Sequence, residues 1–266
     1  MTPRVPAVPY RVGMIVPSSN VTMETEVPEV LNRHAAARGG SGRGFTFHSS
    51  RAVLHNVDPA SLSAMVCESD RCAAELADAK VDVVAYACLI AIMAEGTNAH
   101  ESAEARLSRT LAGAGCPCPV TSSAGALVRC LQALGARSVA IVAPYLRPLT
   151  GMVCDYLAGY GIEVVSSVSL EVPDNVEVGR LDPARLVDHA SSLELRRADA
   201  LVLSACVQMP SLPAIEAAGE EFGLPVVSAA TATAAEILNL LGEDPIVEGS
   251  GAALSGAIRA AGATGL

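Results

Sequence analysis

Two Ala-Cys dipeptides are the residues of this chain best suited to chemistry. Cys88 and Cys206 each follow a wholly apolar run that is typical of a buried strand. A thiolate is a strong nucleophile, and a thiol can also deliver or accept a proton at carbon. A thiol placed just after a strand can lie near the N-terminus of a following helix, where the partial positive charge lowers its pKa. Two such thiols facing each other across a cleft would form a catalytic pair.

A structural role is the alternative for each cysteine, because Cys is among the residue types most often buried. That interpretation would be preferred for one Ala-Cys alone, but two at matching positions of a repeat favour function. The spacing of the cysteines lacks the patterns of zinc sites, so no metal is expected. Six further cysteines are expected to be structural: Cys67, Cys72, Cys116, Cys118, Cys130 and Cys154.

The elements that must position the two thiols form an internal repeat. VDVVAYACL (residues 81–89) parallels ADALVLSACV (198–207), and PVTSSAGALVRCLQALG (119–135) parallels PVVSAATATAAEILNLLG (225–242). Alternating strands and helices imply parallel sheets. The sequence therefore predicts an α/β fold of two pseudo-symmetric lobes, each a parallel four-stranded sheet flanked by helices, with the active site in the cleft between them. The first lobe is expected to comprise residues 1–123 and 230–266, and the second residues 124–229.

The expected elements follow from apolar periodicity, with Asp58-Pro59 as a helix start and glycines as helix ends. Strands are expected at 12–16, 45–50, 81–87, 119–122, 138–143, 162–170, 200–205 and 225–228. Helices are expected at 22–37, 62–79, 100–114, 124–134, 149–160, from 182–183 to about 197, and at 231–241, with a further Pro-rich helix start between Cys206 and the strand at 225–228.

Other polar groups are expected at the same edge as the thiols, since ligands of open parallel sheets bind outside the carboxyl ends of the strands. Asn20 follows the first strand and Tyr145 ends its counterpart in the second half; Asn175 follows the strand expected at 162–170. The alternatives are an ordinary turn asparagine and a packing tyrosine. Backbone N–H groups at Leu89 and Val207, just after the cysteines, could bind a carboxylate.

Several residues are not expected to take part in chemistry. Glu24 and Glu26 are interpreted as first-turn acids that favour the helix dipole. The glycines between 39 and 44 lack the GK[ST] pattern of a phosphate-binding loop. The five histidines show no catalytic spacing and are expected at the surface or at helix ends: His34, His48, His55, His100 and His189.

Composition excludes some partners. The formal net charge is −10, aromatic residues make up 3% of the chain and Trp is absent, so neither nucleic acid nor an anionic membrane is an expected partner. The N-terminal residues contain no signal-peptide pattern and no run is long enough to span a bilayer, so a cytoplasmic location is expected.

Six segments resemble maleate cis-trans isomerases of the aspartate/glutamate racemase superfamily, which also includes arylmalonate decarboxylase and hydantoin racemase. These segments are IVPSSNVTMETE (15–26), YACLIAIM (86–93), TSSAGALV (121–128), VAPY (142–145), Asp174-Asn175 and LSACVQMPSLP (203–213). The resemblance covers nearly the whole chain. Val21 stands where a Thr would be expected, and residues after about 242 carry no diagnostic motif.

The resemblance implies a covalent route without a cofactor. Cys88 matches the nucleophile, which adds to the double bond of maleate, and Cys206 matches the general acid/base at the neighbouring carbon. Rotation and elimination would then give fumarate. Asn20, Tyr145 and Asn175 match positions that bind the two carboxylates, together with backbone N–H groups after each cysteine. The resemblance also implies a homodimer.

Two other functions remain open from the residues. A cofactor-independent amino-acid or hydantoin racemase would use two cysteines to exchange a proton at one carbon, but PSSN and METE differ from the usual racemase pattern. A non-catalytic dicarboxylate-binding protein would not need two thiols at strand ends. A decarboxylase would normally retain one of the two cysteines.

Overall fold

The first of two parallel sheets carries Cys88 at the end of its third strand. The computed structural model describes residues 8–39, 42–54 and 58–256. Within them the first sheet has the strand order β2-β1-β3-β4 and every neighbouring pair is parallel. Its strands are β1 (Tyr10–Pro17), β2 (Phe45–Ala52), β3 (Val83–Tyr86) and β4 (Val120–Ser122).

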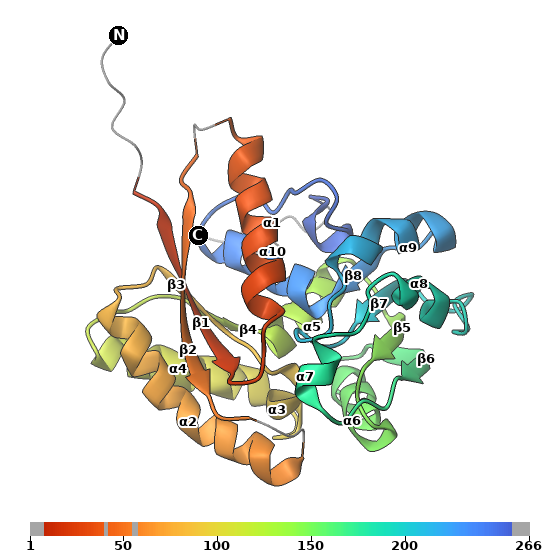
Figure 1. Cartoon of the computed structure of the whole chain (residues 1–266), viewed down its shortest axis with the longest axis horizontal. Helices are drawn as coiled ribbons and strands as arrows, with labels where there is room; N and C mark the ends of the chain where they lie inside the picture. The colour runs from red at the N-terminus through yellow and green to blue at the C-terminus, as the bar shows by residue number, and fades with distance from the viewer. Residues whose placement is uncertain (1–7, 40–41, 55–57, 257–266) are drawn as a thin grey trace.

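The second sheet repeats this arrangement, with the order β6-β5-β7-β8 and parallel pairing throughout. Its strands are β5 (Ser138–Ala143), β6 (Glu163–Ser169), β7 (Ala200–Ser204) and β8 (Val226–Ser228). Because each strand of one sheet has a counterpart in the other, the predicted pseudo-symmetric α/β fold is confirmed. We call each sheet with its surrounding helices a lobe (Figure 1).

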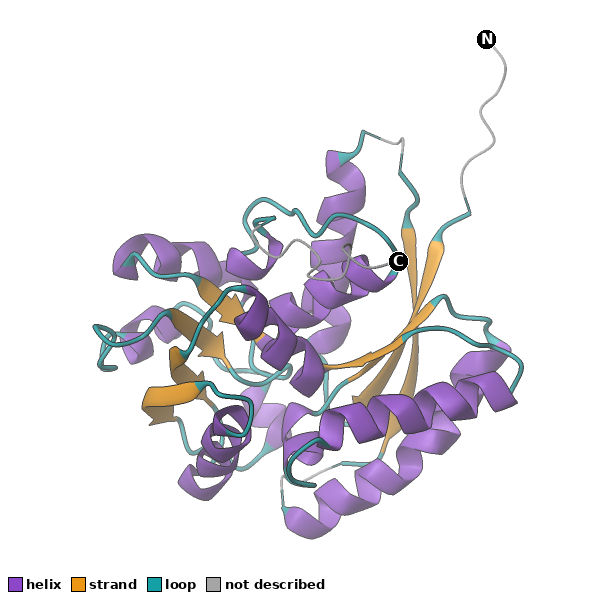
Figure 2. Cartoon of the chain, turned by 180° about the vertical axis from the view of Figure 1, so that it is seen from behind, coloured by secondary structure: helices purple, strands orange, loops and turns teal. Residues whose placement is uncertain are grey.

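Ten α-helices within the described residues surround these sheets. In the first lobe α2 and α4 cover one face of the sheet (Figure 2). The helices are α1 (Met23–Ala37), α2 (Pro59–Asp78), α3 (Leu89–Met93), α4 (Ala99–Gly113), α5 (Ser123–Ala133), α6 (Arg147–Ala158), α7 (Asn175–Val178), α8 (Arg185–Ala190), α9 (Ile215–Phe222) and α10 (Ala229–Leu240). None of the described helices has an apolar stretch long enough to cross a bilayer.

The central strands are apolar on both faces because helices cover both sides of a parallel sheet. All residues of β3 and β7 are buried, which fixes the positions where these strands end. Cys88 and Cys206 come two residues after those ends, so the rigid cores of the two lobes determine where the thiols lie.

Two helices link the lobes and begin in the same way. The hydroxyl of Ser122 accepts a hydrogen bond from the Gly125 N–H at the start of α5, and the hydroxyl of Ser228 accepts one from the Thr231 N–H at the start of α10. α5 and α10 pack against each other at the boundary of the lobes (Figure 1). The predicted residue boundaries of the lobes, at 123–124 and 229–230, stay a prediction.

Some local predictions were wrong. The helix expected to reach about residue 197 ends at Ala190, because the hydroxyls of Ser191 and Ser192 bond back to the carbonyls of Val187 and His189. The short helices α3 and α7 were not predicted, since four or five residues show no helical period. His34 lies in the last turn of α1 and His100 in the first turn of α4, at helix ends as predicted, although both are buried. His55 lies outside the described residues.

Candidate active site

One cavity between the lobes brings the seven predicted site residues together. It is nearly closed: the centre of a water-sized sphere can occupy about 20 Å³, room for about one water molecule. The cavity is lined by Pro17, Asn20, Leu54, Cys88, Leu89 and Ile90 of the first lobe and by Tyr145, Asn175, Cys206, Val207 and Gln208 of the second.

Cys88 lies between β3 and α3 in a left-handed backbone conformation, with φ 86° and ψ 70°. A side chain in this region strains the backbone, and such strain is concentrated at functional sites. Burial raises the pKa of the Cys88 thiol to about 12, whereas the backbone N–H of Ala91 lowers it and the charge of Cys206 raises it. Cys88 is therefore held as a neutral thiol until something in the site favours its anion.

Cys206 follows β7 and is surrounded by more donors. Its Sγ accepts a hydrogen bond from the Gln208 N–H at 3.4 Å. Burial raises the pKa of this thiol, while the Tyr145 hydroxyl and the N–H groups of Gln208 and Met209 lower it. The hydroxyl of Ser204 holds the loop by donating to the carbonyls of Cys206 (2.8 Å) and Met209 (3.3 Å).

Tyr145 is buried beside Cys206 and donates to the Ala205 carbonyl at 3.2 Å. Burial raises the pKa of the phenol well above its usual value, with further contributions from Cys206 and Cys88. The hydroxyl therefore keeps its proton. Because it has a single hydrogen, it can turn that hydrogen from the Ala205 carbonyl to a negative charge in the cavity.

Asn20 and Asn175 come from different lobes, and Ser19, the residue before Asn20, is hydrogen-bonded to Asn175. The Oδ1 of Asn20 accepts from the Met23 N–H at 3.0 Å, which leaves its NH₂ group as a donor. The Nδ2 of Asn175 donates to the Oγ of Ser19 at 2.8 Å. Both asparagines are buried in the cavity wall.

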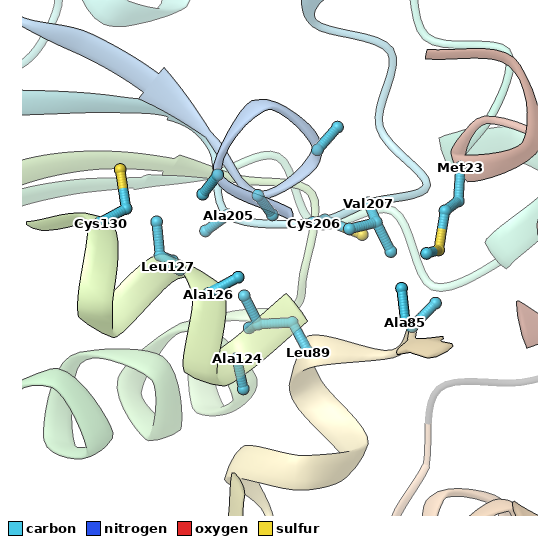
Figure 3. Close-up of a cluster of buried hydrophobic side chains, with 14 of the residues drawn as sticks. Met23, Ala85, Leu89, Ala124, Ala126, Leu127, Cys130, Ala205, Cys206 and Val207 are labelled. Atoms are coloured by element: carbon cyan, nitrogen blue, oxygen red, sulfur yellow. The ribbon is translucent and has the colours of Figure 1, made fainter. Parts of the chain in front are cut away.

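Among the residues that the structure describes, those lining the cavity include no lysine, arginine or histidine. An anion bound there would therefore be held by neutral donors, which are amides, the Tyr145 hydroxyl and backbone N–H groups. Figure 3 shows Leu89 of α3 in one buried cluster with Cys206 and Val207 of the other lobe, so the backbone after each thiol reaches the same region.

Two residues of the site region have side-chain roles that the sequence did not predict. Gln208 lines the cavity, and its one sequence signal was an amide within an otherwise apolar run after β7. Glu26 is a first-turn acid of α1, as predicted, but its carboxylate also bonds to the other lobe. It is buried and accepts from the N–H groups of Ser211 (2.6 Å) and Leu212 (2.7 Å) and from the Ser211 hydroxyl (3.1 Å).

The buried histidine His100 lies away from the cavity. Its Nδ1 is 2.7 Å from the Tyr156 hydroxyl, in an aromatic cluster where α4 meets α6. Within the described residues no three His, Cys, Asp or Glu side chains are grouped so that they could hold a metal ion.

Comparisons with known proteins place this chain in a family. The family model described as arylmalonate decarboxylase matches residues 12–254. The maleate isomerase of Geobacillus stearothermophilus is 52% identical over 247 residues, covering 93% of this chain and 98% of that protein. The chain belongs to the maleate isomerase family.

Solved structures agree with this placement. A cysteine-to-alanine variant of the Pseudomonas putida S16 maleate isomerase, solved with maleate, is 45% identical with a TM-score of 0.90, covering 94% of this chain and 99% of that one. A cysteine-to-serine mutant of Nocardia farcinica maleate cis-trans isomerase, with a covalently bound succinylcysteine intermediate, is 47% identical with a TM-score of 0.88, covering 92% and 98%. The recognised resemblance to maleate isomerases is confirmed.

Arylmalonate decarboxylase shares the fold more distantly, at 22% identity and a TM-score of 0.70, covering 92% of this chain and 98% of that one. Its likeness concerns the arrangement of the sheets. Membership of the maleate isomerase family rests on the closer relatives.

Proposed function

We propose that this protein converts maleate to fumarate through covalent addition of the Cys88 thiolate to the double bond. The observation that carries the proposal is that Cys88 and Cys206 line one narrow cavity from opposite lobes. Family membership supplies the substrate, because the relatives are maleate isomerases. The cis double bond blocks rotation, so the enzyme must make it a single bond for part of the cycle.

The first step forms a carbon–sulfur bond. An electron pair of the Cys88 thiolate attacks one vinylic carbon, and the π electrons move to the neighbouring carbon, where the adjacent carboxylate delocalises them. The Cys206 thiol gives its proton to that carbon. The product of this step is a succinyl group on the sulfur of Cys88, with Cys206 left as the thiolate.

The second step reverses the first after rotation about the new single bond. The Cys206 thiolate removes a proton from the carbon that was protonated, the carbon–sulfur electrons return to Cys88, and fumarate leaves. No atom is gained or lost, and the pair again holds one proton. The donors around Cys206, from Tyr145 and the Gln208 N–H, suit a group that carries the negative charge in the intermediate.

The substrate carboxylates would be bound by neutral donors. We assign this role to Asn20, Asn175 and Tyr145 and to the backbone N–H groups of Leu89 and Val207, all of which belong to lining residues. A bound substrate would leave little room for water in so narrow a cavity, which favours protonation of the carbanion by Cys206.

Three further features accompany this proposal. The enzyme would work without a cofactor, as a homodimer, in the cytoplasm. Support comes from the thiol chemistry, which needs no added electrophile, and from family resemblance. Activity after dialysis against a chelator and the mass in solution by light scattering test the first two, and cell fractionation tests the third.

The deciding experiment is a proton NMR time course with maleate, comparing the wild-type protein with Cys88→Ala and Cys206→Ala. We expect fumarate from the wild type and a steep loss in each variant. A folded wild type that makes no fumarate would overturn the proposal. Exchange of an α-proton of aspartate or a hydantoin would then indicate a racemase, and maleate binding without turnover would indicate a binding protein.

A further inference from the structure

The side-chain amide of Gln208 is a buried group that the mechanism above does not use. Its Oε1 accepts from the N–H groups of Val21 (2.9 Å) and Thr22 (3.3 Å), and its Nε2 donates to the carbonyls of Ser19 (3.1 Å) and Asn175 (2.8 Å). The residue is 1% exposed. Two N–H donors and two carbonyl acceptors fix which end of the amide is oxygen.

These four hydrogen bonds connect both lobes at the cavity wall. Residues 19, 21 and 22 flank Asn20 in the first lobe, whereas Asn175 and Gln208 belong to the second. The backbone N–H of Gln208 also contacts the Cys206 sulfur at 3.4 Å. One side chain thus sets the separation of the two asparagines and is joined to the loop that carries the second thiol.

A glycine beside this amide, Gly179, leaves room for it. A Cβ at Gly179 would lie 2.6 Å from the Nε2 and 3.2 Å from the Cδ of Gln208. The backbone φ of Gly179 is −67°, which any residue adopts, so the glycine is required for space and not for conformation. Two separate positions therefore support one arrangement of the Gln208 side chain.

We propose that Gln208 is a positioning residue that holds Asn20 and Asn175 at the spacing that binds the two carboxylates. This inference rests on the proposed function. The amide does not touch the reacting atoms, so its loss should weaken substrate binding more than it slows the chemical step. Loss of its two donated hydrogen bonds should raise KM for maleate about tenfold or more, with a smaller change in kcat.

Gln208→Glu gives the sharpest test because it keeps the shape. One oxygen still accepts from Val21 and Thr22, but the other faces the carbonyls of Ser19 and Asn175 and repels them when ionised. Protonation turns that oxygen into a donor. Burial and the two facing carbonyls should raise the pKa of this carboxyl above its ordinary value. The KM of the variant relative to wild type should therefore be large at about pH 8 and fall towards about pH 5, as the carboxyl gains its proton. Gln208→Leu, which has no proton to gain, should show a raised KM ratio that does not change with pH.

Tyr156→Phe is the matched control. It removes another contact between lobes, the bond from the His100 N–H to the Tyr156 hydroxyl, outside the cavity. We expect its KM to stay at the wild-type value while thermal stability falls. Gly179→Ala, which displaces the amide without altering it, should reproduce the raised KM if the Gln208 variants do not fold.

The outcomes separate the two proposals. A wild type that makes no fumarate contradicts the proposed function. An active wild type with unchanged KM in Gln208→Glu at both pH values, or in Gly179→Ala where Gln208 variants do not fold, overturns the role of Gln208. A lower kcat with unchanged KM overturns it as well, since that pattern indicates loss of folded enzyme only.

Discussion

Cys88 and Cys206 follow equivalent strands of the two sheets, yet only Cys88 of the pair has a left-handed backbone. The chain turns directly into α3 after Cys88, whereas Cys206 is followed by a loop closed by Ser204 and by the Gln208 N–H. The repeat therefore supplies two thiols in two environments. This difference fits a pair in which one sulfur bonds to carbon and the other carries the proton.

The two cysteines should behave as a single unit. Cys88→Ala and Cys206→Ala should each lower kcat by at least about 10²-fold, and the double variant should be little worse than Cys88→Ala alone, because neither thiol completes the cycle without the other. Turnover of maleate in all three variants measures this. Losses that multiply in the double variant would indicate that the thiols act independently.

Activity should rise with pH on the alkaline side of neutrality. The attack needs one thiolate in the pair, and burial raises the pKa of both thiols, to about 12 for Cys88. The fraction of free enzyme with one proton lost therefore grows as pH increases. A plot of log kcat/KM against pH should climb with a slope of about one. A flat profile from neutral to alkaline pH would show that the pair is already ionised.

Glu26 should be replaceable by its amide but not by an apolar side chain. One of its oxygens accepts both N–H groups, of Ser211 and Leu212, and a glutamine oxygen can do the same. Glu26→Gln should change the free energy of unfolding by less than about 1 kcal/mol, whereas Glu26→Leu should cost about 2–4 kcal/mol by leaving two buried donors unpaired. Urea unfolding of both variants tests this, and equal losses would contradict it.

Two helical glycines should respond in opposite ways to alanine. A Cβ at Gly125 of α5 would clash with Glu104 and would lie 2.7 Å from His100 and 2.8 Å from Arg129, so we expect Gly125→Ala to destabilise by about 1–3 kcal/mol. Gly151 of α6 has open space around it, so Gly151→Ala should stabilise by about 0.5–1 kcal/mol. Thermal unfolding compares the two, and a stabilised Gly125→Ala would disprove the clash.

Stability should fall at alkaline pH, in part because of Cys130. Burial and the charge of Glu236 raise its pKa from the usual 9.0 to about 12. Between these values the thiol of the unfolded chain has lost its proton, whereas the thiol of the folded protein has kept it. The free energy of unfolding therefore falls as pH rises through this range. The contribution of Cys130 to stability is complete below pH 9.0. Between the two pKa values, the free energy of unfolding of Cys130→Ala should fall by about 1.4 kcal/mol less per pH unit than that of wild type. Parallel stability curves would refute this.

Local sequence determined the architecture. Apolar runs predicted the central strands β1, β3, β5 and β7, and Asp58, Ser122 and Ser228 cap helices where a short polar side chain precedes a helical pattern. The matching Ala-Cys positions indicated that the thiols would meet, because the ends of equivalent parallel strands lie at equivalent edges. These features depend on neighbours along the chain, so the sequence carries them directly.

The tertiary structure alone decided which polar groups are buried and what they bind. Glu26 and Ser211 are 185 residues apart, and Gln208 bonds to Ser19 over 189 residues. No local pattern distinguishes an exposed first-turn glutamate from one enclosed by another lobe, since the helix around it has the same period in both cases. The sequence determined two thiols on two sheets. Only the packing of the lobes decided the hydrogen bonds that close the cavity around them, because the donors and acceptors come from segments that meet when the chain is folded.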